Sequence, residues 1–340
     1  MTEDIVEFEA GDGLPCHLIH VRGERKPHKG PVLLVHGAGV RANIFRPPVR
    51  QTFVDYLLEH GYDVWLENWR ASIDLPPTPW TLDQAARYDH PAAVCKVQEE
   101  TGSDTLKAVI HCQGSTSFMM AAVAGLLPQV TTIVSNAVSL HPQVSWAADL
   151  KGRLALPIVA RMTPYLDPQW GEHAQGFVPR LLAALVNLTH HECDNGVCKF
   201  SSFTYGVGFP VLWRHENLDA AIHDWIRGEF GKVSLAFFLQ MERCLRAGHL
   251  VAYEDIDGLP RDYLAQPPRT EARFAFVAGA MNRCFDWRSQ QKTFDYFDRI
   301  RPNYHSLQVL GGYGHLDVFM GKHAARDTFP VLLAELDRPH

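Results

Sequence analysis

One short stretch limits the folds open to this chain more than any other, because it joins a buried strand to a helix through a single residue. The stretch is Leu106 to Ala122, LKAVIHCQGSTSFMMAA. Its first part is an apolar run of the length of a buried strand, and its last part is rich in residues that favour helices. The residue at the junction is Cys112. The sequence therefore predicts a sharp strand-to-helix turn with a cysteine at its tip.

A side chain at such a turn stands clear of the sheet and faces the first turn of the helix. The backbone N–H of the next residue and the positive end of the helix both stabilise negative charge there. A thiol ionises more readily than a hydroxyl, and a helix N-terminus favours the thiolate further. We therefore expect Cys112 to be a nucleophile rather than an inert buried cysteine. Ser115 lies inside the first helical turn, and we do not expect it to take this role.

Strands and helices alternate on both sides of this stretch, which indicates a mostly parallel sheet with helices on both faces. Residues 4–22 predict two antiparallel strands at the edge of the sheet. The other elements predicted before the middle of the chain are a strand at 31–35, a helix at 43–60, a strand at 63–66, a helix at 88–100 and a strand at 131–138. Those predicted near its end are a strand at 274–277, a helix at 289–300, a strand at 305–310 and a terminal helix reaching residue 336.

The alternation stops between the strand at 131–138 and the strand at 274–277. Helical patterns fill this gap, at residues 150–161, 178–188, 218–230 and 234–246. We therefore expect two parts. Residues 1–142 and 268–340 form the core, and residues 143–267 form a mainly helical cap, or lid, inserted before the last two strands.

Composition narrows the class of protein. The chain is 46% hydrophobic and 21% charged, as ordinary globular proteins are. Its net charge of -6 without a basic block argues against a nucleic-acid partner. The opening MTEDIVEFEAGDG has neither the pattern of a signal peptide nor that of a membrane span, so we expect a cytoplasmic protein. Seven scattered cysteines indicate reduced thiols rather than a disulfide framework, and the sequence leaves the oligomeric state open.

The order of these motifs resembles the α/β-hydrolase family over nearly the whole chain. The motifs are a strand followed by HGAG at residues 36–39, the cysteine turn, the long insertion, and a late His315 in a glycine-rich loop. The HLD motif at 315–317 and the helical cap resemble the acid-lipase branch. The segments HCQGST, RHENL and GYGHLDVFMGKHAARD are similar to the hydrolase domains fused or adjacent to cholesterol-oxidase-type (GMC) flavoenzymes, whose elbows also carry cysteine. The resemblance implies the α/β-hydrolase fold with a cysteine nucleophile.

The resemblance also implies roles for four residues. Cys112 matches the family nucleophile, and His315 matches its general base. The backbone amides of Ala38 and Gln113 match the two donors of the oxyanion hole.

Three positions depart from the family pattern. Cys112 replaces the usual serine, Ile110 replaces the usual glycine, and Asn282 replaces the usual aspartate. A branched Ile110 at a crowded turn predicts either a slightly opened turn or small residues packed opposite. The other two departures support one another, because a thiolate and imidazolium pair formed before attack lets a neutral amide orient the ring, as in cysteine proteases. Asp286 is the alternative third member beside Asn282, and the sequence does not choose between them.

Two further groups of residues invite a chemical interpretation. His111 precedes the nucleophile, and we expect it to point away from Cys112 as buried scaffold. Cys193 and Cys198 lie near His190 and His191 and imitate a metal site, but their C-x4-C spacing is not one of the strong zinc patterns. We therefore expect no metal at these residues, and the chemistry requires no cofactor.

These residues predict a hydrolase that cleaves an ester, lactone or thioester through an acyl-Cys112 intermediate. The many aromatic residues of the cap favour a small-molecule substrate with an apolar or bulky acyl group. One alternative is an acyltransferase or cyclase that uses the same acyl-cysteine while the cap excludes water. The other is a protein on the same fold that binds a small ligand without turning it over.

Overall fold

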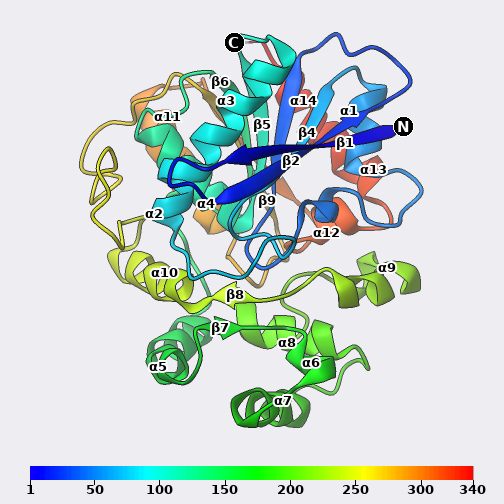
Figure 1. The fold of residues 1–340 in the computed structure, drawn as a ribbon, viewed down its shortest axis with the longest axis vertical. Helices are drawn as coiled ribbons and strands as arrows, with labels where there is room; N and C mark the ends of the chain where they lie inside the picture. Colours follow the sequence, from blue (N-terminus) through cyan, green and yellow to red (C-terminus); the bar gives the residue numbers. More distant parts are fainter. Residues whose placement is uncertain (340) are drawn as a thin grey trace.

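An eight-stranded sheet organises the structure, a computed structural model that describes residues 1–339 (Figure 1). The strand order is β1-β2-β4-β3-β5-β6-β9-β10, antiparallel at β1 and β2 and parallel from β4 onward. The strands are β1 (Thr2–Glu9), β2 (Pro15–Arg22), β3 (Pro31–Val35), β4 (Asp63–Asn68), β5 (Leu106–His111), β6 (Val130–Asn136), β9 (Arg273–Gly279) and β10 (Ser306–Leu310). The predicted mostly parallel sheet with an antiparallel edge is confirmed.

The burial of the strands explains why their positions could be predicted from the sequence pattern. Every residue of β3 and of β9 is buried, as expected for parallel strands that are covered on both faces. β1 lies at the open edge, where charged side chains keep the strand from pairing with another chain.

Helices cover both faces of this sheet (Figure 1). On one face lie α3 (His90–Thr101), α4 (Cys112–Val123) and α11 (Arg288–Ile300), and on the other lie α1 (Phe53–Glu59) and α14 (Phe329–Asp337). Ser135 of β6 ties the first face together, because its hydroxyl hydrogen-bonds both Ser115 of α4 and Gln290 of α11.

Some predicted helices are shorter than the sequence pattern suggested. The helix predicted at 43–60 is wrong as a single element, because it consists of a 3-10 turn, η1 (Ala42–Phe45), and α1. The prolines at positions 47 and 48 cannot continue a helix, and Thr52 starts α1 afresh through a capping box with Asp55. The terminal helix is likewise divided into α12 (Asp317–Met320), α13 (Ala324–Asp327) and α14. The short α2 (Leu82–Gln84) and a π-helical turn, Ala85–Asp89, precede α3.

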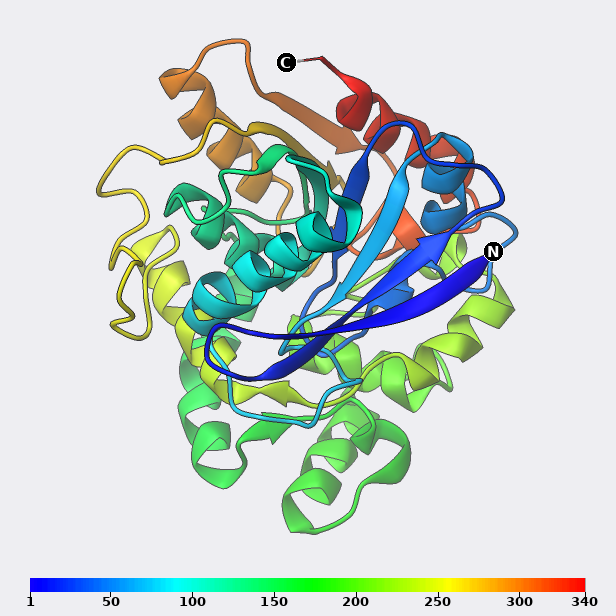
Figure 2. The same ribbon diagram turned by 45° about the horizontal axis from the view of Figure 1, so that its top comes forward.

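The insertion between β6 and β9 forms a separate layer at the carboxyl ends of the parallel strands (Figures 1 and 2). Its elements are α5 (Trp146–Met162), β7 (Tyr165–Leu166), α6 (Trp170–His173), α7 (Phe177–Thr189), α8 (Gly196–Tyr205), η3 (His215–Asn217), α9 (Ala220–Trp225), η4 (Ile226–Gly228), β8 (Val233–Ser234) and α10 (Leu235–Ala247). The name cap is kept for the segment predicted to form it, residues 143–267. The sequence pattern did not predict α8, whose start is fixed by a side-chain cap from Asn195.

The chain returns to the core soon after α10. The N–H of Leu250 donates to the carbonyl of Leu140, and the N–H of Tyr253 donates to the Asp83 carboxylate. Leu250 and Tyr253, which belong to the segment predicted as the cap, therefore contact the core. Of the helices in the described part of the chain, none combines the length and the apolar character needed to cross a bilayer.

Candidate active site

Cys112 occupies a strained position at the end of β5. Its backbone φ is +56°, in the left-handed region that a side chain rarely adopts, and α4 begins at the same residue. Two glycines make room for the turn. A Cβ on Gly37 would lie 2.8 Å from the Cβ of Cys112, and one on Gly114 would lie 2.2 Å from the carbonyl oxygen of His36. Small residues are therefore needed at both positions beside the turn.

Three groups stabilise negative charge on the sulfur of Cys112, and a ring nitrogen of His315 lies within 4.8 Å of it. The three groups are the Cys284 thiol, the His315 ring and the backbone N–H of Gln113. Burial opposes ionisation of the sulfur, but the Cys284 thiol, the His315 ring and the amide of Gln113 together hold the pKa of Cys112 well below its ordinary value. The pKa of Cys284 is raised well above its ordinary value by its bond to Cys112 and by burial, so Cys284 stays a neutral donor. The arrangement favours a thiolate at Cys112.

Asn282, rather than Asp286, contacts the ring of His315. The side-chain nitrogen Nδ2 of Asn282 lies 3.1 Å from Nδ1 of His315. The oxygen Oδ1 of Asn282 accepts the backbone N–H groups of Cys284 and Phe285, at 2.9 and 3.1 Å, which decides the orientation of the amide. An amide nitrogen only donates, so this contact offers a donor to Nδ1 of His315 and no acceptor for an Nδ1–H.

The structure places Asp286, the alternative third member, away from this contact. Its carboxylate accepts hydrogen bonds from the backbone and the guanidinium of Arg288, at 2.9 to 3.3 Å, and is partly exposed. The carboxylate lies at the start of α11, whereas the amide of Asn282 faces the histidine.

The HGAG loop meets the cap beside Cys112. The hydroxyl of Tyr205, at the end of α8, donates to the carbonyl oxygen of Ala38 at 2.8 Å. A cavity of about 10 Å³, the size of one water molecule, is bordered by Ala38, Cys112 and His315. Together with the Gln113 N–H at the sulfur, this arrangement is compatible with an oxyanion hole made by the Ala38 and Gln113 amides.

A larger, mostly apolar cavity of about 140 Å³ opens from Cys112 between the core and the cap. Its apolar wall comes from α5, α10 and the loop before α5, and includes Val144, Leu156, Val159, Phe237, Phe238 and Met241. Lys151 also lines the cavity, but its ammonium donates to the carbonyls of Phe203 and Gly206 and lies 4.2 Å from the Phe203 ring centroid. Burial lowers the pKa of Lys151 to about 8.

Two residues of the site were missed by the sequence-based reasoning. Cys284 had no motif to mark it, since only folding brings its thiol to Cys112. The expectation that His111 points away from Cys112 is wrong. Its ring centroid lies 4.6 Å from that of His315, and ligating atoms of His111, Cys112 and His315 lie within 4.8 Å of one another. His111 Nδ1 lies 2.7 Å from the side-chain oxygen of Asn136, and burial followed by the charge of His315 lowers its pKa well below the ordinary value. The His111 ring is therefore neutral and packs against the His315 ring.

A second serine, histidine and carboxylate chain lies beneath the site. His90 is 2.7 Å from the Ser117 hydroxyl and 2.9 Å from the Glu67 carboxylate. All three side chains are fully buried. The distances between them resemble those of a catalytic triad, but no substrate can reach the serine. The Ser117 hydroxyl also donates to the Gln113 carbonyl at 2.9 Å, so this network supports the first turn of α4.

No family model matches the chain. Among curated proteins, human lipase member K is 34% identical over 335 residues, which cover 92% of this chain and 82% of the lipase. Triacylglycerol lipase 1 of Arabidopsis thaliana is 22% identical over 355 residues, covering 98% of this chain and 86% of that enzyme. Sterol esterase 2 of Saccharomyces cerevisiae is 27% identical over 203 residues, which are 53% of this chain but 37% of the esterase.

Solved structures resemble the whole chain at low sequence identity. An alpha/beta hydrolase, GrgF from Penicillium sp. sh18, superposes with a TM-score of 0.60 at 15% identity and covers 99% of this chain and 97% of its own. DcsB, solved with a substrate analogue, gives a TM-score of 0.59 at 13% identity, covering 98% and 99%. These likenesses establish a shared fold and carry no argument about chemistry.

Proposed function

Because the chain belongs to the α/β-hydrolase family, in the group of lipases and esterases that act on ester bonds, we propose that it cleaves its ester through a covalent acyl-Cys112 intermediate. One observation carries the proposal. The sulfur of Cys112 lies at the strained turn, within 4.8 Å of a ring nitrogen of His315, and borders the apolar cavity. A thiolate in that position is an activated nucleophile.

The first half of the reaction transfers the acyl group to sulfur. The Cys112 thiolate attacks the ester carbonyl carbon, and the Ala38 and Gln113 amides bind the oxyanion. The tetrahedral intermediate then collapses as its carbon–oxygen bond breaks. The leaving oxygen takes a proton from Nε2 of His315, so an alcohol departs and a thioester remains on Cys112.

The second half of the reaction regenerates the free thiolate of Cys112. His315, now neutral, removes a proton from water, and the resulting hydroxide attacks the thioester carbonyl. The carbon–sulfur bond breaks, which releases the carboxylic acid and restores the thiolate and imidazolium pair.

Asn282 limits this cycle. When His315 carries protons on both ring nitrogens, its Nδ1–H needs an acceptor, but the present orientation of Asn282 offers a donor. The amide must then turn over to present Oδ1 and give up its bonds from Cys284 and Phe285. Each lost bond costs about 1 kcal/mol, so Asn282 stabilises the imidazolium less than an aspartate would.

The substrate that fits best is an ester with an apolar acyl chain. The wall of the cavity supplies the site for that chain. Apolar side chains also lie exposed along one face of α5 at a spacing of four residues, namely Trp146, Leu150, Leu154, Ile158 and Met162, and along α7. Such a face beside the cavity suits esters presented from an aggregated or lipid-like phase.

Acyl transfer is the second candidate function. The cavity beside Cys112 is mostly apolar and buried under the cap, so water is scarce where the thioester would form. An alcohol of suitable shape would then compete with water for the acyl group. Product analysis in the presence of a medium-chain alcohol separates ester formation from hydrolysis.

Intact-mass spectrometry after mixing with an activated medium-chain ester tests the proposal. We expect an acyl adduct that maps to the peptide bearing Cys112, is released by hydroxylamine, and is absent from Cys112→Ala. Ser115→Ala, which removes the neighbouring hydroxyl, should keep the adduct. Undiminished turnover by folded Cys112→Ala would reject the cysteine mechanism and leave the fold and family unaffected.

A further inference from the structure

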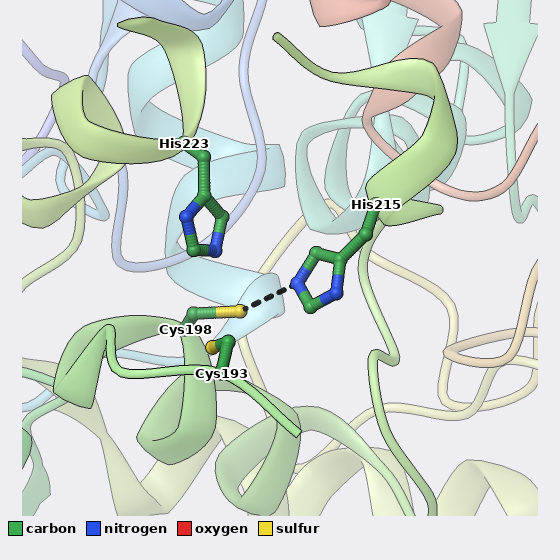
Figure 3. A group of neighbouring side chains, drawn as sticks. All are labelled: Cys193, Cys198, His215 and His223. Carbon is green, nitrogen blue, oxygen red and sulfur yellow. Dashed lines mark hydrogen bonds between the residues drawn. The ribbon is translucent and has the colours of Figure 1, made fainter. Parts of the chain in front are cut away.

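Four ligating side chains meet in the cap, away from the catalytic turn. They are Cys193, Cys198, His215 and His223, whose ligating atoms all lie within 4.8 Å of one another. Figure 3 shows both histidine rings directed at the two sulfurs, with a contact of 3.4 Å between Cys198 Sγ and His215 Nε2. The histidines next to Cys193 in the sequence bond elsewhere, since His190 contacts the Thr189 hydroxyl and His191 the Leu188 carbonyl.

We propose that these four residues bind a structural Zn²⁺ ion. Two sulfurs and two imidazole nitrogens are a ligand set that zinc prefers. With Zn–S about 2.3 Å and Zn–N about 2.0–2.1 Å, the edges of a tetrahedral site measure roughly 3.3–3.8 Å. The 3.4 Å contact between Cys198 and His215 already has the length of such an edge. The expectation of no metal rested on the C-x4-C spacing, which does not reveal histidines contributed from η3 and α9.

An unpartnered nitrogen supports the site independently. Nε2 of His223 is buried and has no hydrogen-bond partner among residues 1–339. Figure 3 shows the ring of His223 pointing toward the sulfurs. A buried polar atom without a partner is costly, and a bound cation would satisfy it.

The surrounding hydrogen bonds fix the backbones of the ligands. The side chain of Asn195 accepts the N–H of Cys198 at 3.0 Å and donates to the carbonyl of His223 at 2.6 Å. One residue therefore holds two of the ligand-bearing segments before any ion binds. The protein supplies four ligands, which leaves no open position for substrate and indicates a structural ion.

Both cap segments that carry ligands also reach the catalytic loops. α8 starts near Cys198 and ends at Tyr205, which bonds the HGAG loop. The segment at His215 continues to Asn217, whose side chain donates to the Gly312 carbonyl and the Asp317 carboxylate, on either side of His315. Zinc at this site would hold the cap against the loops that carry the oxyanion donor and the general base.

Metal content of the purified full chain tests the site directly. The protein is purified under reducing conditions, incubated with a slight excess of Zn²⁺, gel-filtered and analysed by atomic mass spectrometry. We expect about one zinc per chain in the wild type and a fall of roughly tenfold or more in His223→Ala. Replacement by Co²⁺ should give the visible bands of a tetrahedral ion with thiolate ligands, and these should vanish in the same variant.

Matched control variants show which side chains the ion needs. The double variant His190→Ala/His191→Ala should retain the ion, because those rings lie outside the group. Cys95→Ser should also retain it, since this exposed thiol is not one of the ligands. His223→Ala retains every thiol. Circular dichroism should first show that this variant folds, and its metal content is measured afterwards.

Three outcomes would overturn the proposal. The first is a folded wild-type chain that retains no zinc after incubation. The second is equal loss of zinc from His223→Ala and from the His190 and His191 control. The third is a disulfide between Cys193 and Cys198 in protein purified without reductant. It would be detected as two free thiols fewer than the sequence contains and located by peptide mapping. The measured quantity is the bound ion, so the result does not depend on the proposed ester cleavage.

Discussion

The side-chain nitrogen of Asn282 lies 3.1 Å from Nδ1 of His315, where the family pattern has an acceptor from aspartate. Because two backbone N–H groups hold the amide oxygen, this donor cannot be exchanged for an acceptor without cost. The contact therefore offers no acceptor to an Nδ1–H of the ring unless the amide turns over. It makes the third position of the site the place where the proposed chemistry is most easily tested.

Asn282→Asp should raise kcat/KM at neutral pH by about tenfold. One carboxylate oxygen keeps the bonds from Cys284 and Phe285 while the other accepts Nδ1–H, so the imidazolium is stabilised. Asn282→Leu should lower kcat/KM by roughly tenfold, because the ring loses its anchor. Steady-state kinetics over pH 5–9 measure both. If kcat/KM fell in Asn282→Asp and stayed unchanged in Asn282→Leu, Asn282 would have no role in the mechanism.

Cys112→Ser should lose at least about a thousandfold in kcat, because a hydroxyl needs a stronger base than His315 with an amide partner. Cys112→Ser/Asn282→Asp should recover about tenfold or more of that loss, since the aspartate restores the acceptor that the serine mechanism uses. Single-turnover kinetics with an activated ester provide the measurement. Cys112→Ala/Asn282→Asp is the control and should stay inactive.

Alkylation of Cys112 by iodoacetamide should remain fast as the pH falls below the ordinary thiol value of about 8.5. Its pKa is lowered in the folded protein, so the thiolate persists down to that lower pKa and is lost only below it. His315→Ala removes a positive charge and a hydrogen bond, and should move the midpoint upward. Rates come from mass spectrometry of the labelled peptide, with Cys112→Ala giving the background. An unchanged midpoint in His315→Ala would mean that the two groups do not interact.

Cys284→Ala should also raise the pKa of Cys112, because it removes a thiol that hydrogen-bonds the sulfur. Cys284→Ser retains a donor and should keep most of the low pKa. The pH dependence of alkylation measures the pKa of Cys112 in both variants. Cys244→Ala is the matched control, since it removes another buried thiol that bonds the Val251 carbonyl instead. Equal shifts in Cys284→Ala and Cys284→Ser would argue for packing rather than hydrogen bonding.

Leu154→Lys/Ile158→Lys should reduce turnover of a dispersed long-chain ester several-fold and leave a soluble short-chain ester unaffected. Both side chains are more than half exposed on the apolar face of α5, so the fold should tolerate the change. Each added charge opposes adsorption to an apolar phase. Ile300→Lys is the control, because this exposed residue ends α11 on the core. A similar loss on both esters would show damage to the site rather than to the surface.

The sheet was predictable because each buried parallel strand is a short apolar run bounded by turn residues. β3 matches its predicted limits, and β5 and its cysteine turn follow from one continuous stretch. The helix at 43–60 was wrong because helical spacing of apolar residues continued across two prolines. Asn282 could be nominated from the family pattern, but only the fold separates it from Asp286.

The remaining site residues could not be predicted, because they come from segments that no short motif connects. Cys284 meets Cys112 from a loop far along the chain, and His111 faces His315, contrary to the expectation that it points away from Cys112. In the cap, the sequence drew attention to Cys193 and Cys198 with the wrong histidines. Their neighbours in space lie 17 or more residues away from Cys198, on separate turns.

The bond from Tyr205 to the carbonyl of Ala38 ties the cap to the loop that we propose to form the oxyanion hole. A movement that lifts α8 to admit substrate also frees the peptide that begins the oxyanion loop. Grafting a foreign cap onto this core would therefore change reaction rate as well as selectivity, unless the graft supplied a hydroxyl at the same point.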